Sequence, residues 1–143
     1  MAIVYFDSSA LVKLVVDEVG SDLAEQLWDS CDAALSSRLA YPEVRAALAA
    51  ANRNHVLDDR ELLESLDSWE EFWAAVRPVE LTANVERSAG ELAERRSLRG
   101  ADAVHLASAL TVPRSELVVA AWDHRLNAGA QEEGLAVAPH MER

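Results

Sequence analysis

The chain of 143 residues contains a single cysteine, Cys31. One cysteine excludes an internal disulfide and a multi-cysteine zinc site, so we interpret Cys31 as a small side chain that fills space in the core. The sequence also lacks an apolar run of membrane-spanning length, and a strand-like segment follows the first residue without a basic leader. We therefore expect a cytoplasmic protein that does not enter a membrane.

Aromatic residues and positive charge are also scarce. Aromatics make up 6% of the chain, the formal net charge is -12, and Lys13 is the only lysine. Because phosphate backbones attract basic surfaces, this acidity by itself favours a protein partner over a nucleic acid. Three arginines nevertheless lie close together, Arg95, Arg96 and Arg99. They are either bidentate phosphate ligands or the solvated, favourably charged end of a helix.

Half of the residues are apolar, which is enough to build one compact domain over residues 1–143, and no change of composition marks a linker. Short apolar runs alternate with segments of helical periodicity, which predicts an α/β fold with a central, mostly parallel sheet of four to five strands and helices on both faces. We expect strands at 2–6, 33–36, 76–81, 117–122 and 134–138, and Pro78 places the third of them at an edge. We expect helices from residue 8, from 20 to about 31, around Pro42, and at 58–75, 83–97, 101–110 and from 123.

Four acidic residues stand in apolar or alanine-rich surroundings: Asp7, Glu43, Asp102 and Asp123. Asp7 and Asp123 directly follow predicted strands, at the end of an open sheet where ligands bind. Clustered carboxylates repel one another, and burial makes their charged forms costly, so such a cluster persists by protonation or by binding a cation. For each acid the alternative is a helix cap or a first-turn position that the helix dipole favours.

The donor types indicate which cation this cluster would bind. Several carboxylates without a cysteine or a pair of histidines suit Mg²⁺ or Mn²⁺ and disfavour zinc. Such ions polarise a phosphoryl oxygen and lower the pKa of bound water. The sequence therefore predicts metal-dependent hydrolysis of a phosphodiester.

Four segments carry a resemblance to a known family, in their order and spacing: residues 4–14 (VYFDSSALVKL), Glu43, residues 99–109 (RGADAVHLASA), and residues 122–126 (WDHRL) followed by Gly134 and Leu135. In these segments the chain resembles the PIN-domain ribonucleases, and within them the VapC-type toxins of bacterial toxin–antitoxin pairs. The resemblance spans nearly the whole chain. One departure is Ala121, where many relatives carry a threonine or serine two residues before the fourth acid.

The resemblance implies a PIN-like three-layer sandwich and an endoribonuclease that acts as the toxin of a type II toxin–antitoxin system. It implies that Asp7, Glu43, Asp102 and Asp123 are catalytic and hold Mg²⁺ or Mn²⁺ while RNA is hydrolysed. It also implies a cognate VapB-type antitoxin as inhibitor, and a homodimer.

Three further residues are candidates for supporting roles. Ser9 either caps the first helix or orients a water molecule at the metal, as the hydroxyl in the family's first motif suggests. His105 lies one helical turn beyond Asp102 and is either satisfied locally or supports an acid from the second shell. Arg99 is a candidate substrate contact.

Two other functions remain open from the sequence. A metal-dependent phosphatase with Asp7 as nucleophile would need a second acid two residues later, where this chain has Ser9. A PIN-like module that binds protein without catalysis would fit the net charge and the tryptophan-bearing segment at 58–75.

Overall fold

The computed structural model describes residues 2–140, and five parallel strands form its central sheet in the order β3-β2-β1-β4-β5. The strands are β1 (Ile3–Phe6), β2 (Ala33–Ser37), β3 (Arg77–Val79), β4 (Leu117–Ala120) and β5 (Ala136–Ala138). The predicted parallel sheet is confirmed, and β3 occupies an edge as Pro78 requires.

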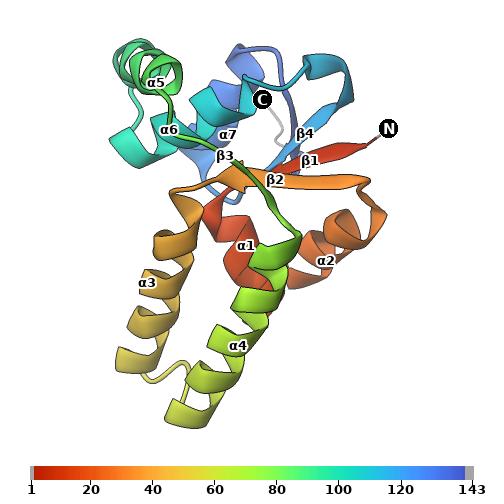
Figure 1. Ribbon diagram of the computed structural model, residues 1–143, viewed down its shortest axis with the longest axis vertical. Coiled ribbons are helices and arrows are strands. Elements are labelled where there is room, and N and C mark those ends of the chain that lie inside the picture. Colours follow the sequence, from red (N-terminus) through yellow and green to blue (C-terminus); the bar gives the residue numbers. More distant parts are fainter. Residues whose placement is uncertain (1, 141–143) are drawn as a thin grey trace.

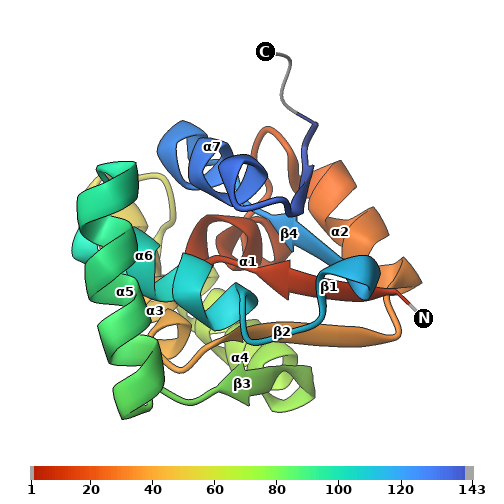
Figure 2. The ribbon, with the colours of Figure 1, turned by 90° about the horizontal axis from the view of Figure 1, so that it is seen from above.

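Helices cover both faces of the sheet, as Figures 1 and 2 show. One face carries α5 (Ala83–Arg96), α6 (Gly100–Ala109) and α7 (His124–Glu132). The other carries α1 (Ser8–Val15), α2 (Ser21–Ser30), α3 (Ala40–Arg53) and α4 (Asp59–Ala75), and a short 3-10 helix, η1 (Arg114–Glu116), precedes β4. The predicted three-layer sandwich is confirmed. Within residues 2–140, none of the helices is long and apolar enough to cross a membrane.

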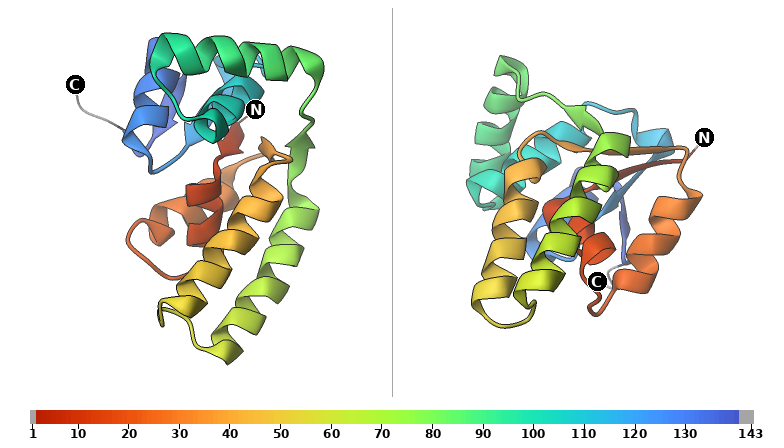
Figure 3. Two further views of the ribbon diagram at one scale, coloured as in Figure 1. Left: turned by 90° about the vertical axis from the view of Figure 1, so that its left-hand side faces the viewer. Right: turned by 60° about the horizontal axis from the view of Figure 1, so that its bottom comes forward.

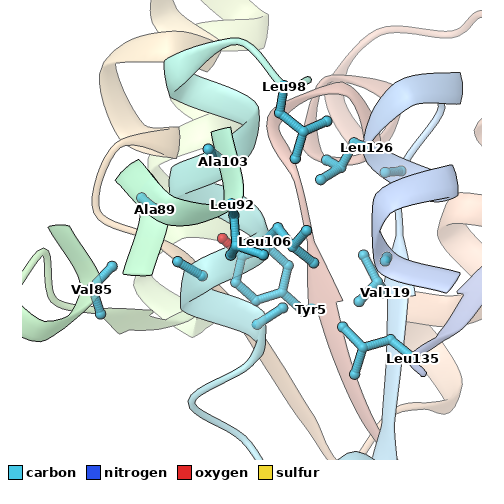
Figure 4. Packing of buried hydrophobic residues seen from close by; sticks show 14 of the residues in the cluster. Tyr5, Val85, Ala89, Leu92, Leu98, Ala103, Leu106, Val119, Leu126 and Leu135 are labelled. Carbon is cyan, nitrogen blue, oxygen red and sulfur yellow. The ribbon is translucent and has the colours of Figure 1, made fainter. Parts of the chain in front are cut away.

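The alternation of side chains along β1 divides the core into two halves. Tyr5 packs with α5, α6 and α7, whereas Val4 and Phe6 point to the opposite face and pack with α1, α3 and α4. Figure 4 shows Tyr5 among Leu92, Leu106 and other side chains of the first half. Because β1 is the middle strand and is buried on both faces, the residue that follows it is held in a fixed place.

The helix pair of α3 and α4 extends away from the sheet, as Figure 3 shows. Trp69 of α4 is fully buried and lies against Tyr41 and Trp73, with ring centroids 6.1 and 5.5 Å away. The tryptophan-bearing helix is therefore anchored to its neighbour by aromatic packing. Trp69 and Trp73 are thus core and helix-pair contacts and do not form a separate binding surface.

Several boundaries differ from the sequence prediction by one or two residues, and among them β3 ends at Val79 instead of 81 and β5 begins at Ala136 instead of 134. Strand β4 ends at Ala120, two residues earlier than expected, because the backbone N–H of Trp122 donates to the Ser9 hydroxyl instead of to a neighbouring strand. Gly100 begins α6 rather than preceding it, since Arg99 has the extended backbone of an N-cap residue. Cys31 is only partly buried, although it does pack at the margin of the second core half.

Two of the three clustered arginines serve the fold. Arg96 of α5 donates to Glu132 and to Glu133 at the end of α7, at 2.6 and 2.5 Å, and Arg95 donates to both oxygens of Glu133 at 3.2 Å. These ion pairs join the C-terminal end of α5 to the C-terminal end of α7. Arg95 and Arg96 lie in the last turn of α5, as the helix-end alternative expected, and their ion pairs to Glu132 and Glu133 make them structural contacts.

We predict that Glu133→Gln lowers the melting temperature by a few degrees at neutral pH. The hydrogen bonds from Arg96 and Arg95 hold the pKa of Glu133 below its ordinary value, so its stabilisation is present above the unfolded pKa of about 4.3. It is lost as the pH falls through the lower pKa of the folded state. Melting curves between pH 7 and pH 3 should therefore show the two proteins converging in acid, and a constant difference would contradict the prediction.

Candidate active site

Four acidic side chains gather at the edge of the sheet where its parallel strands end. Asp7 follows β1 and is the N-cap of α1, and Asp123 follows β4 and is the N-cap of α7. Glu43 and Asp102 lie in the first turns of α3 and α6. The capping positions considered as alternatives are thus real for Asp7 and Asp123. Side-chain contacts link Glu43 to His105, and Asp102 to Asp123 through Arg99.

Asp7 is 5% exposed, and its Oδ1 accepts hydrogen bonds from the Ser9 hydroxyl at 2.6 Å and from the Ala10 N–H at 2.9 Å. Burial raises the pKa of Asp7, and the charge of Asp102 adds to this rise. The interaction with His105 and the two hydrogen bonds oppose it. Both hydrogen bonds that the structure gives to Asp7 within residues 2–140 use Oδ1. Its second oxygen therefore remains available to another partner.

Ser9 links two strands of the site. Its hydroxyl donates to Asp7 and accepts from the N–H of Trp122 at 3.0 Å, so it joins the end of β1 to the segment after β4. The N-cap of α1 is Asp7, and the expectation that Ser9 caps this helix is wrong. Ser9 instead fixes the rotamer of the buried carboxylate.

Glu43 is held by two neighbours. Its Oε1 accepts from the Ser8 hydroxyl at 2.6 Å and lies 2.7 Å from Nε2 of His105. Burial alone would raise the pKa of Glu43, but the hydrogen bonds from His105 and Ser8 outweigh it, so the pKa lies below its ordinary value. Glu43 is consequently charged and oriented at neutral pH.

His105 connects Glu43 to the core through Tyr5. The histidine is 2% exposed, and its Nδ1 lies 2.7 Å from the hydroxyl of the fully buried Tyr5. Burial raises the pKa of Tyr5, so its hydroxyl keeps its proton. Because Tyr5 keeps its proton, we assign its hydroxyl as donor to Nδ1, which leaves Nε2–H as donor to Glu43. His105 therefore supports an acid of the site from behind, the second of the two roles considered from the sequence.

Arg99 lies between the other two acids. Its guanidinium donates to Oδ2 of Asp102 at 3.3 Å and to Oδ2 of Asp123 at 3.4 Å, while 72% of its side chain remains exposed. Burial raises the pKa of Asp102, the nearby charge of Asp123 adds to the rise, and Arg99 opposes it. These two carboxylates are thus close enough to repel each other, and Arg99 offsets their repulsion.

The donor chemistry of the site fits a hard divalent cation, because four carboxylates lie at the starts of four helices on one edge of the sheet. As the side chains are placed, however, no three or more His, Cys, Asp or Glu residues within 2–140 form a group that could hold a metal ion. Two contacts account for this. Glu43 is drawn toward His105, and Arg99 lies against Asp102 and Asp123.

Sequence reasoning missed Ser8 and Tyr5. Tyr5 alternates with Val4 and Phe6 and so faces α6, which carries His105, but only the register of helix and strand brings the two side chains into contact. The signal for Ser8 was its position next to Asp7, at the start of a helix whose first residues face the same edge. Ser8 and its partner Glu43 are 35 positions apart in the chain, and Tyr5 and its partner His105 are 100 apart.

The chain was compared with known proteins. The family model of the PIN domain matches residues 4–126 of this chain. Ribonuclease VapC45 of Mycobacterium tuberculosis is 66% identical over 139 residues, which cover 97% of this chain and 96% of the relative. The chain therefore belongs to the PIN domain family and is a VapC-type member of it, as the resemblance implied.

Two solved structures show the same fold. PAE2754 from Pyrobaculum aerophilum has a TM-score of 0.71 at 18% identity, with 95% of this chain and 83% of that chain covered. A toxin-antitoxin complex from Klebsiella pneumoniae has a TM-score of 0.66 at 17% identity, with all of both chains covered. The fold is thus shared at identities too low to carry a function.

We predict that Asp102→Asn leaves the metal-free protein at least as stable as the parent at neutral pH. Burial and the charge of Asp123 raise the pKa of Asp102 in the folded protein. The contribution of Asp102 to the free energy of unfolding is therefore full below the unfolded pKa of about 3.9, and it is lost as the pH rises through the higher folded pKa. The neutral amide escapes this loss. Melting curves in a chelator should show an equal or higher melting temperature at pH 7, and a drop of several degrees would contradict the repulsion described here.

We predict that His105→Ala costs about 2–4 kcal/mol of unfolding free energy, because it opens a cavity and removes the partner of two polar groups. The exposed His124, changed to alanine, is the control and should cost less than about 0.5 kcal/mol. A double-mutant cycle in urea supplies the sharper test. Tyr5→Phe should cost less in the His105→Ala background than in the parent, and strict additivity would show that the two residues are not coupled.

Proposed function

We propose that the protein is a metal-dependent endoribonuclease that hydrolyses RNA phosphodiester bonds and acts as the toxin of a type II toxin–antitoxin system. The single observation that carries the proposal is the convergence of Asp7, Glu43, Asp102 and Asp123 at the carboxyl edge of the sheet in a VapC-type chain. The relative VapC45 is named a ribonuclease, and its identity of 66% extends along almost the entire chain.

Asp7, Glu43, Asp102 and Asp123 would hold the ion, which we propose to be Mg²⁺ or Mn²⁺. When bound, such an ion polarises a phosphoryl oxygen and lowers the pKa of water near it. The protein supplies the orientation. Ser9 and the Ala10 N–H fix Asp7, while Ser8 and His105 hold Glu43. Fixed carboxylates need little rearrangement when a cation and a substrate arrive.

Arg99 is proposed to change partners during the reaction. In the structure Arg99 pairs with Asp102 and Asp123, and because its side chain is exposed it could release these carboxylates if they held a cation. A displaced guanidinium next to the site would then be positioned to pair with a substrate phosphate. This supports the candidate role of Arg99 as a substrate contact.

The two other functions lose support. An aspartyl-phosphatase reading needs an acid at the position of Ser9, whose hydroxyl is engaged by Asp7 and Trp122. A binding module without catalysis would not need four carboxylates at one edge, where their repulsion requires Arg99 and His105 as counterparts.

We propose a VapB-type antitoxin as the inhibitory partner, in agreement with the toxin-antitoxin complex among the structural neighbours. The position of Arg99 shows that a guanidinium fits between Asp102 and Asp123. An arginine from the partner would compete for the same carboxylates, and the net charge of -12 would speed its approach. A homodimer and a cytoplasmic location complete the proposal.

We predict that the purified protein cleaves RNA with added Mg²⁺ or Mn²⁺ and stops when a chelator is added. Asp7→Asn and Asp102→Asn should each reduce the cleavage rate at least about 100-fold, because each removes a charged oxygen ligand. Gel analysis of RNA fragments and calorimetry with the metal alone measure cleavage and ion binding separately.

The matched control for this experiment is Asp67→Asn, an acid on α4 that takes no part in the site. It should keep full cleavage and full ion binding. Cleavage that survives the chelator would overturn the proposal. Hydrolysis of a phosphate monoester without cleavage of RNA would favour the phosphatase instead.

A further inference from the structure

An open pocket lined by two arginines adjoins the acidic edge. It encloses about 450 Å³, and its walls are Arg99, Trp122, Asp123, His124 and Arg125. This volume lies within the range of about 300–1,000 Å³ that small-molecule sites occupy. Asp123 belongs to both places, since it caps α7 and pairs with Arg99. A ligand in the pocket would therefore lie directly beside the carboxylates.

Whereas the protein as a whole is negative, the charged side chains of this pocket are mostly positive. Its walls carry two guanidinium groups and one carboxylate, in a chain with a net charge of -12. Arg125 is exposed, and within residues 2–140 it has no ion pair to a carboxylate. An unpaired arginine next to an acidic edge is a free ligand for an anion.

Trp122 forms a rigid aromatic wall. Its backbone N–H is bound by Ser9, and Lys13 Nζ lies over its ring, 5.1 Å from the centroid. Lys13 is itself held by Glu18 at 2.8 Å. Gly20, with a φ of +96°, leaves room for the ring, because a Cβ there would lie 2.7 Å from the indole Nε1. The ring is thus fixed before any ligand arrives.

We propose that this pocket is a subsite for one nucleotide of single-stranded RNA, adjacent to the bond that is cut. The base stacks on Trp122, and the phosphate pairs with Arg125, with His124 as a further donor. An aromatic platform beside an arginine is the combination that single-strand binding proteins use. The assignment rests on the proposed ribonuclease function, because it supplies the substrate contact for that reaction.

The subsite explains how a strongly acidic protein holds an RNA strand. Stacking is available to every base, so the pocket contributes affinity without choosing a sequence. Arg125 contributes the electrostatic part, which salt weakens. The two contributions can therefore be separated by changing one residue at a time.

The first experiment replaces Arg125 with alanine and measures the binding of a labelled single-stranded oligodeoxynucleotide in Mg²⁺ by fluorescence anisotropy. A DNA strand of about ten nucleotides, within the site size of single-strand binders, offers bases and phosphates but is not a ribonuclease substrate. We expect affinity to fall about 10-fold at low salt, and the slope of log K against log salt to shrink by about 0.7, the value for one phosphate contact.

Arg114 provides the matched control. It is exposed, it has no ion pair to a carboxylate within the described residues, and it precedes β4, at the end of that strand opposite to Asp123. Arg114→Ala removes the same charge and should leave both affinity and salt slope unchanged. Equal losses in the two variants would mean that only the net charge matters, and would overturn the subsite.

The second experiment separates stacking from packing at Trp122. Trp122→Phe keeps an aromatic face, whereas Trp122→Leu does not. We therefore expect the affinity for the oligodeoxynucleotide to fall about 10-fold in the Trp122→Leu variant and less than about 3-fold in the Trp122→Phe variant. Melting curves identify any loss of fold, and the comparison is made between variants of similar stability. Equal binding by Phe, Leu and the parent would remove Trp122 from the subsite.

RNA cleavage distinguishes this proposal from the function on which it rests. Arg125→Ala should raise KM while kcat stays near that of the parent, because the residue binds substrate and holds no ion. If the parent cleaves RNA and Arg125→Ala has the same KM and DNA affinity, the subsite is wrong and the nuclease stands. If DNA binding depends on Arg125 and Trp122 but no RNA is cleaved, the subsite stands and the nuclease is wrong.

Discussion

The buried carboxylate of Asp7 is the constraint on which the arrangement of this edge depends. Asp7 ends the middle strand, caps α1 and binds Ser9, and Ser9 in turn holds the backbone of Trp122. A charged group at 5% exposure is costly unless its oxygens are satisfied. Ser9, which donates to Oδ1 of Asp7, also accepts from the Trp122 N–H, so the residue that holds one buried acid also fixes the segment leading to Asp123.

The acids of the site fall into two pairs, each associated with one side chain of the protein. His105 contacts Glu43 and opposes the rise in the pKa of Asp7, whereas Asp102 and Asp123 share Arg99. His105 is buried and is anchored by Tyr5, while most of the Arg99 side chain is exposed. The contact to Glu43 is thus made by a buried side chain, whereas Asp102 and Asp123 are held by the exposed Arg99, which can move away.

Much of this site could be predicted from the sequence, and the remainder could not for a definite reason. Asp7 and Asp123 follow apolar runs, so the periodicity of strands is enough to place them at one edge. The contact of Tyr5 with His105 joins residues 100 positions apart, and it depends on how α6 lies across the sheet. The early end of β4 has the same origin, because Ser9 takes the Trp122 N–H. Patterns in the sequence describe elements, whereas these contacts depend on how elements pack.

The distribution of arginines reconciles the acidity of the chain with action on RNA. Of the twelve lysines and arginines in residues 2–140, seven form ion pairs with carboxylates, and of these seven only the exposed Arg99 is proposed to exchange its carboxylates for a phosphate. An RNA strand is repelled by most of such a surface and gains attraction only where an unpaired guanidinium lies near the site. Arg125 meets this condition at the rim beside Asp123. Repulsion elsewhere then directs the strand to the edge where the carboxylates lie, so the net negative charge restricts where RNA binds without preventing it.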